Sequence, residues 1–380
     1  FSCYLPSSRS PRASLSSVVA SSRKSTSFTL PPITSSTSSK RLPRSRSQPS
    51  TRQASFALKY RILAPIDNGA FGIVLKAVVV KTGKTVAIKR VNLAKRSRLE
   101  ALRELCALQN CRHRNIISLI DASCTESTLS LIMEFVPSNL KQMIEDPRRD
   151  RRNEVVVAFF FRQILAALAY LHKHGVMHRD VKPSNILITS SNAVKLADFG
   201  QACLHYPNRP EKEYEEQVGT RAYRAPELLF SHLRYSPSVD WWAAGVLLVE
   251  MTTATTLFPG KSDLEQISLM FSTLGTPTPK TWPEFTSLPD SKKIVFDPIP
   301  PPTDHLTGLL PHSSPSLRSL VSSLLCLSPS LRRAPSSLLS HRLFRSLPSQ
   351  IPYRTPRHAA NNSSSRDLHT LDSIFADMSL

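Results

Sequence analysis

The sequence of 380 residues lacks the cysteine pattern of disulfide or zinc proteins and the long apolar runs of membrane proteins. Its six cysteines are scattered without a CxxC pair, which argues against a disulfide framework or a zinc site and favours a reducing intracellular compartment. No apolar run approaches the ~18–20 residues that a membrane-spanning helix needs. We therefore expect a soluble protein with no membrane partner.

Acidic residues are absent from the first 60 positions, which hold ten Lys and Arg. Residues 61–345 hold 36 basic and 25 acidic residues, so the net charge of +21 is unevenly spread. A positive field of this size favours acidic partners such as nucleotides, phosphoproteins, nucleic acid or a membrane surface.

Residues 1–56 also contain few apolar side chains and are rich in Ser, Arg and Pro. Such a segment cannot repay the entropy of ordering, so we predict that it is disordered. The same composition fits an organelle transit peptide, which leaves organelle targeting open beside a nuclear or cytoplasmic location. Its SR and RS dipeptides leave RNA binding and phosphate acceptance open as well.

The chain changes character at Tyr60. Short β-branched runs bounded by turn residues predict antiparallel strands, and apolar residues at helical spacing predict a helix over 98–110. After Pro137 the pattern is mostly helical, with apolar helices expected over 154–175, ended by Gly175, and over 238–253. The expected strands are 60–66, 72–80, 84–91 and 128–136, with turns at 67–69 and 82–83. This order predicts an α+β fold, with a small β-rich lobe before a larger helical lobe.

Two motifs carry the chemistry: HRDVKPSN at residues 178–185 and DFG at 198–200. Phosphoryl transfer needs Mg²⁺ held by oxygen ligands, a carboxylate that orients the attacking hydroxyl, and a cation near the moving phosphate. Asp180 can supply the carboxylate, Lys182 the cation, and Asn185 with Asp198 the metal ligands.

With APE at 225–227, these motifs resemble those of the protein kinases in order and spacing, and the resemblance covers roughly residues 58–345. It implies a bilobal kinase domain over 57–345, with an N-lobe at 57–136 and a C-lobe at 137–345, followed by a polar tail at 346–380. It also implies ATP and Mg²⁺ as cofactors and proteins as substrates.

The resemblance implies further roles. Lys89 of VAIK matches the lysine that holds the α- and β-phosphates, and Glu104 matches its ion-pair partner. Glu227 and Arg332 match a buried pair, and Asp240 matches an aspartate that braces the catalytic loop.

The nucleotide site is implied in the same way. The hinge is expected at residues 134–136, whose backbone would bind adenine, with Met133 behind it. Asp67 stands where the first glycine of a GxGxxG loop is usual, but the remaining glycines still allow the backbone to approach phosphates. The residues expected around the nucleotide are Ile66, Gly69, Gly72, Val74, Ala87, Lys89, Glu134, Val136 and Leu187.

Several stretches resemble the cyclin-dependent kinase branch, among them ALRELCALQ, YRAPELL and GTPTPKTWPEFTSLPD, the last being similar to the cell-cycle-related kinases. In this branch, Arg224 would favour proline after the phosphorylated Ser or Thr. The segment between Lys89 and Glu104 is shorter than usual where a cyclin would bind, so a cyclin or another activator stays open. Ala70 and Phe71 replace an inhibitory Thr-Tyr pair, and Ala222 replaces a usual Trp.

The stretch YEEQVGTRAYRAPE, residues 214–227, has Glu215 where the resembled kinases have an activating threonine. The phosphate on that threonine gathers three arginines. Two are present here, Arg103 and Arg179, and Cys203 replaces the third. We interpret Glu215 as a substitute for the phosphate, the alternative being an exposed acidic turn. Thr220 and Tyr214 are other candidate phosphorylation sites in this loop.

Two other functions stay open beside an active Ser/Thr kinase. Asp67 and Ala222 are compatible with a catalytically weak scaffold of the same fold. The basic segment 1–56 is compatible with a nucleic-acid-binding protein.

Overall fold

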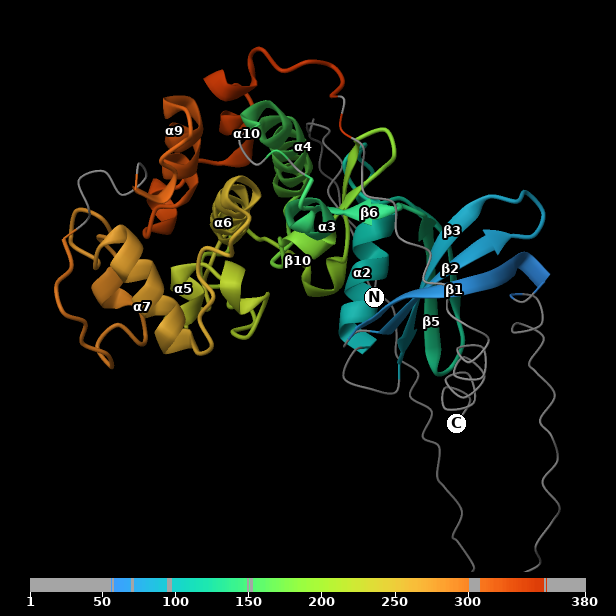
Figure 1. Ribbon diagram of the computed structural model, residues 1–380. Helices are drawn as coiled ribbons and strands as arrows, with labels where there is room; N and C mark the ends of the chain where they lie inside the picture. Colours follow the sequence, from blue (N-terminus) through green and yellow to red (C-terminus); the bar gives the residue numbers. More distant parts are fainter. Residues whose placement is uncertain are drawn as a thin grey trace, which may run out of the picture. The chain divides into compact units, whose positions relative to one another are not determined.

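The computed structural model describes residues 56, 58–69, 72–93, 98–148, 150, 153–300, 308–351 and 353 (Figure 1). For residues 68 and 69 it describes the backbone and not the side chains. The basic segment expected to be disordered (except Phe56), the pair Ala70-Phe71 and most of the polar tail therefore lie outside the described residues.

The N-lobe is built on a five-stranded antiparallel sheet with the order β1-β2-β3-β5-β4. Side chains alternate along its strands, so that Leu75, Ala77 and Ile88 are fully buried in one core. The prediction of a turn at residues 67–69 is wrong, because these residues continue β1 and pair with β2 as far as Gly69. The strands are β1 (Tyr60–Gly69), β2 (Gly72–Val79), β3 (Thr85–Asn92), β4 (Leu119–Cys124) and β5 (Thr128–Glu134).

The helix α2 (Arg98–Asn110) accompanies this sheet and has the predicted bounds. Its buried face consists of Ala101, Glu104 and Leu108. Leu99 and Leu102, two of the apolar residues whose helical spacing predicted this helix, are 55% and 42% exposed. The apolar spacing predicts a helix but does not say which face of it is buried. In the folded protein the buried face is the one that carries Glu104.

The C-lobe is mainly helical, which confirms the α+β class. α4 packs against α6 and α10, and α6 packs against α9. Gly175, with φ of +68°, follows the C-cap of α4 in the left-handed conformation that glycine favours. The longer helices are α4 (Glu154–Lys173), α6 (Ser238–Thr253), α7 (Asp263–Leu274) and α9 (Pro315–Leu324), and the short ones are α3 (Leu140–Glu145), α5 (Pro226–Leu229) and α10 (Pro335–Leu338).

The expectation that no segment is apolar enough to cross a membrane is wrong for α4. By length and composition this helix could span a bilayer, since its most apolar 18-residue window has a mean hydropathy of 1.8. Half of that window is buried inside the protein. A helix that is apolar on most sides also suits the centre of a large domain, and α4 contributes Phe160, Phe161, Ile164 and Leu168 to the main core.

Short strands position the motifs that carry the chemistry. β7 (Val176–Met177) pairs with β10 (Cys203–Leu204), and β8 (Ile186–Ile188) pairs with β6 (Ser138–Asn139) and β9 (Val194–Leu196). The HRDVKPSN residues thus connect β7 to β8, and DFG lies between β9 and β10. Each motif closely follows a short strand with buried side chains, HRDVKPSN directly after β7 and DFG shortly after β9.

The folded part extends past the expected boundary at residue 345. Ile351 is buried, and Asn192 donates hydrogen bonds from Nδ2 to the carbonyl oxygens of Ile351 and Tyr353, at 3.1 and 3.0 Å. The ring of Tyr353 packs edge-on against Phe160 of α4. The first residues assigned to the polar tail therefore belong to the domain.

The predicted pair of Glu227 and Arg332 is confirmed as a fully buried ion pair with two hydrogen bonds of 2.7 Å. We expect Arg332→Met to lower the Tm by roughly 6–15 °C, because a carboxylate left buried without its partner costs about 3–5 kcal/mol. Thermal unfolding followed by circular dichroism measures the change. As a control, Lys141→Met removes an exposed pair with Glu145 at 3.9 Å and should cost at most about 0.5 kcal/mol. Equal effects of the two substitutions would contradict the argument.

Candidate active site

Lys89 connects the two lobes at the centre of the site. Its Nζ lies 2.7 Å from Oε2 of Glu104 on α2 and 2.8 Å from Oδ1 of Asp198. Burial alone would lower the pKa of this lysine, but the two carboxylates raise it above its ordinary value. The ion pair expected from the sequence is therefore formed in this single chain, and it extends to the DFG aspartate.

Asp198 has an unusual backbone conformation for a residue other than glycine, with φ of +63°. Burial would raise the pKa of its carboxyl, but the attraction of Lys89 and its hydrogen bond lower it below the ordinary value of 3.8. The group is thus ionised at neutral pH. Strained conformations of this kind persist where the surrounding structure enforces them, often at functional sites.

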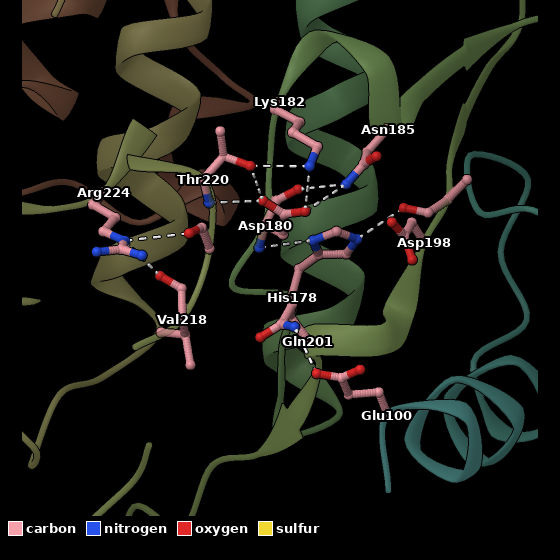
Figure 2. Close-up of polar contacts among 12 residues, drawn as sticks. Glu100, His178, Asp180, Lys182, Asn185, Asp198, Gln201, Val218, Thr220 and Arg224 are labelled. Carbon is pink, nitrogen blue, oxygen red and sulfur yellow. Dashed lines mark hydrogen bonds and ion pairs between the residues drawn. The ribbon is translucent and has the colours of Figure 1, made fainter. Parts of the chain in front are cut away.

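The catalytic-loop residues converge on the carboxylate of Asp180 (Figure 2). Oδ1 accepts hydrogen bonds from the amide and hydroxyl of Thr220, at 3.0 and 2.8 Å. On the other side, Oδ2 lies 2.8 Å from Nζ of Lys182 and accepts a bond of 3.1 Å from Nδ2 of Asn185. Lys182 also donates to the hydroxyl of Thr220 at 2.9 Å. The hydroxyl of Thr220, taken from the sequence as a candidate phosphorylation site, is occupied within this cluster.

Asp240 of α6 holds the backbone of the catalytic loop. Its carboxylate accepts the backbone amides of His178 and Arg179, at 2.9 and 2.7 Å, as expected for a brace. Burial would raise the pKa of Asp240, but the hydrogen bond from His172 and the amide of His178 lower it. Trp241 donates to Nδ1 of His172, so His172 must carry its proton on Nε2, which faces Asp240 at 2.8 Å.

The residues implied as metal ligands offer the right chemistry for Mg²⁺. Asn185 uses its amide nitrogen for Asp180, and Lys89 contacts one of the two oxygens of Asp198. Mg²⁺ is typically held by one or two protein oxygens and completed by phosphates and water. In the described part of the chain, no cluster of three or more His, Cys, Asp and Glu side chains could hold a metal.

The residues expected around the nucleotide lie on strands β1, β2, β3 and β8 and on the hinge. Gly69 pairs with Gly72 at the end of the β1–β2 hairpin, and a Cβ on Gly72 would overlap the carbonyl oxygen of Arg90. This glycine is therefore required for packing against β3 as well as by its φ of +132°. Asp67 is exposed. The apolar members, which are all half-buried, are Ile66, Val74, Ala87, Val136 and Leu187.

The hinge residue Glu134 is held by contacts with neighbouring segments. The amide of Glu134 donates to the carbonyl oxygen of Ser118 at 3.1 Å, so it is not available to adenine. The carboxylate of Glu134 also accepts the amide of Ser118 and lies 2.8 Å from Lys195 of β9. These contacts tie the hinge to its neighbours, and Met133 is buried behind it.

Glu215 lies between the two arginines named from the sequence. Arg103 donates two hydrogen bonds to its carboxylate, of 2.5 and 3.0 Å, and Arg179 donates one of 2.7 Å. Partial burial would raise the pKa of Glu215, but these bonds lower it below the ordinary value of 4.5. Burial raises the pKa of the Cys203 thiol to about 11, so the position of the third arginine is neutral. The side chain of Glu215 is 44% exposed, as the alternative of an acidic turn expects, but its carboxylate is bound by both arginines.

Arg224 turns toward the backbone of the activation loop (Figure 2). Its Nε donates to the carbonyl oxygens of Val218 and Gly219, at 3.0 and 3.2 Å. Gly219 has φ of +69°, and a Cβ there would overlap the carbonyl oxygen of Arg179. Glycine therefore allows the activation loop to pass directly over the catalytic loop.

Tyr235 is an important residue that the sequence did not reveal. Its hydroxyl accepts a hydrogen bond of 2.8 Å from Arg179 and donates one of 2.8 Å to the carbonyl oxygen of Glu215. His172 and the carbonyl of Gln201, which accepts from Nε of Arg179, were also missed. No local pattern marks these groups, because each acts on a residue distant in the sequence.

Comparison with known proteins agrees with this geometry. The model of the protein kinase domain family matches residues 60–344. Cyclin-dependent kinase D-1 of Oryza sativa subsp. japonica is 37% identical over 319 residues, covering 81% of this chain and 73% of the relative. Cyclin-dependent kinase 20 of Danio rerio, a cell-cycle-related kinase, is 38% identical, covering 79% and 90%. Cyclin-dependent kinase D-1 of Arabidopsis thaliana is 36% identical, covering 81% and 77%. The chain therefore belongs to the protein kinase family, as a serine/threonine kinase of the cyclin-dependent kinase branch.

Proposed function

We propose that this serine/threonine kinase is proline-directed and that it needs no phosphate on its activation loop. Independence from activation-loop phosphate rests on the position of Glu215, whose carboxylate joins Arg103 of α2 to Arg179 of the catalytic loop. A phosphate that binds arginines from different elements orders such loops. The carboxylate of Glu215 is part of the amino-acid sequence, so it can order the loop at all times without phosphorylation.

The cluster around Asp180 supports roles in transfer of the γ-phosphoryl group of ATP. Asp180 would orient the acceptor hydroxyl and receive its proton, and Lys182 would face the negative charge of the transferring phosphoryl group. Lys89 would hold the nucleotide phosphates, while Asn185 and Asp198 would hold Mg²⁺. The metal, when bound, neutralises charge on the phosphates.

The contacts of Arg224 support a preference for proline after the phosphorylated residue. Because its guanidinium occupies the carbonyl oxygens of Val218 and Gly219, these groups are less able to accept a hydrogen bond from a substrate amide. Leaving an amide N–H without an acceptor costs about 1–3 kcal/mol. Proline has no N–H and avoids this cost.

The exposed face of α2 is a candidate binding surface for a regulatory partner. Leu99 and Leu102 are exposed there, and an activator, which in the relatives named above would be a cyclin, could cover them. The pair of Lys89 and Glu104 is already formed without such a partner. A partner would therefore stabilise an arrangement that the isolated chain adopts by itself.

We expect Asp180→Asn to reduce kcat by about 10²-fold or more, because the amide cannot accept the hydroxyl proton. The substitution preserves the shape of the side chain, so the Tm and nucleotide binding should change little. Phosphate transfer to a peptide, measured together with nucleotide binding, separates the two effects. Normal turnover in this variant would contradict the assignment, and inactivity of the unsubstituted protein would favour a scaffold.

We expect the unsubstituted kinase to prefer Ser-Pro over Ser-Ala peptides in kcat/KM by about 5- to 100-fold, from the cost of about 1–3 kcal/mol given above. Arg224→Met should reduce this ratio, because the carbonyl oxygens of Val218 and Gly219 become free. Arg234→Met is the control, since Arg234 is exposed and contacts Glu213 instead of these carbonyl oxygens. An unchanged ratio in the Arg224 variant would show that Arg224 does not select proline.

We expect Glu215→Gln and Glu215→Ala to lower kcat several-fold, because both remove the charge that joins Arg103 to Arg179. Phosphatase treatment of the unsubstituted kinase should change little. Glu215→Thr should be weakly active until its new hydroxyl is phosphorylated. Glu216→Gln is the control, since Glu216 contacts Ser231 and neither arginine.

Activity of protein expressed in bacteria decides this last point. Protein that is inert until another kinase phosphorylates the loop would show that Glu215 does not replace the phosphate.

A further inference from the structure

Gln201, the residue directly after DFG, binds two different elements of the site. Its side-chain Nε2 donates a hydrogen bond of 3.3 Å to Oε1 of Glu100 on α2 (Figure 2). Its carbonyl oxygen accepts a bond of 2.6 Å from Nε of Arg179. One residue therefore holds α2 with its side chain and the catalytic loop with its backbone.

The contact between Gln201 and Glu100 lies where α2 packs closely against the DFG segment. Gln201 ends the short 3₁₀ helix η2 (Phe199–Gln201), which packs against α2. A Cβ on Gly200 would lie 3.9 Å from Cβ of Glu100, an ordinary van der Waals distance. Both Gln201 and Glu100 are half-buried, so their hydrogen bond is partly shielded from water and is stronger than a fully exposed one.

The hydrogen bonds of Gln201 complete a ring that starts and ends on α2. From Gln201 the ring passes to the guanidinium of Arg179 and then to the carboxylate of Glu215. Glu215 in turn accepts hydrogen bonds from Arg103. Arg103 and Glu100 are three residues apart on α2, so they are neighbours on its surface. The ring therefore attaches this helix to the catalytic loop at two points about one turn apart.

The same side of α2 carries the acid that binds Lys89. Glu104 follows Glu100 by four residues, which places it one turn further along the helix on the same side. Its carboxylate lies 2.7 Å from Nζ of Lys89. A movement of α2 that breaks the bond of Gln201 would therefore also draw Glu104 away from Lys89.

We propose that Gln201 is a positioning residue that keeps α2 against the catalytic loop through its bond to Glu100, and that it does so in the isolated chain. The inference rests on the role proposed above for Lys89, which is to hold the nucleotide phosphates. Gln201 acts on Lys89 through α2 and Glu104. Loss of its bond therefore weakens the binding of ATP more than the binding of a peptide substrate.

Gln201→Met tests the proposal in the full-length kinase without an added partner, because methionine has a similar length but no amide donor. We expect hydrogen exchange of the α2 amides, followed by mass spectrometry, to become about 2- to 10-fold faster, the change expected for the loss of one hydrogen bond. The KM for ATP should rise, and the KM for a peptide substrate should not. Unchanged exchange in α2, or equal rises in the two KM values, would overturn the proposal.

Lys89→Met separates this inference from the function on which it rests. If Lys89→Met is inactive while Gln201→Met changes neither the exchange of α2 nor the KM for ATP, the inference alone is wrong. Normal phosphate transfer by Lys89→Met would overturn the role of Lys89, and the effect of Gln201 on ATP binding would fail with it.

Reversing the two groups distinguishes this contact from a general loss of packing. Gln201→Glu places two carboxylates opposite each other and should loosen α2 at least as much as Gln201→Met. Glu100→Gln, added to that variant, restores a donor and an acceptor in reversed positions, so the exchange rate of α2 should return toward that of the unsubstituted kinase. A double variant that exchanges as fast as Gln201→Glu alone would show that this contact does not position α2.

Discussion

The buried guanidinium of Arg179 is the group on which the arrangement of the active site depends. Its side chain is 1% exposed, and a positive charge in such a place is costly unless all its donors are satisfied. The carbonyl of Gln201, the hydroxyl of Tyr235 and the carboxylate of Glu215 accept its hydrogen bonds. These acceptors belong to the segment after DFG, to the approach to α6 and to the activation loop. The hydrogen bonds of this one guanidinium therefore hold three segments in position around the catalytic loop.

The backbone of Arg179 adds a second set of constraints. Its amide is bound by Asp240, its φ of +66° is unusual for a residue other than glycine, and its carbonyl oxygen leaves room only for Gly219. The conformation of the catalytic loop and the path of the activation loop are thus set at the same residue. Asp180, the next residue, accepts the amide of Thr220, the residue after Gly219. A change in the activation loop consequently reaches the carboxylate that would orient the substrate.

The charge balance of this site explains how a carboxylate could replace a phosphate. Two guanidiniums face Glu215, and the third expected cation is replaced by Cys203, whose thiol stays neutral because it is buried. A phosphate carries close to two negative charges, which would suit three arginines, whereas one carboxylate suits fewer. In the function proposed above, the loss of the arginine and the loss of the phosphorylated threonine would offset each other.

Sequence patterns predicted those parts of the structure that depend on neighbouring residues. The bounds of α2 and α6 agree with their apolar spacing, and the motif residues from Lys89 to Asp198 meet where the family resemblance implies. Orientation was less predictable, since Leu99 and Leu102 face outward although their spacing is helical. Composition also could not separate a core helix from a membrane span in α4, because burial in protein and burial in lipid select the same side chains.

By itself, the sequence determined which chemical groups are present: the carboxylates of Asp180 and Asp198, the amine of Lys89 and the acid at position 215. It also determined their order, because strands and loops of defined length carry them. Only the tertiary structure decided that Tyr235 completes the site, by joining Arg179 to the carbonyl oxygen of Glu215. The physical reason is that a buried charge takes its partners from whichever segments packing brings within hydrogen-bonding distance, and local patterns contain no record of that distance.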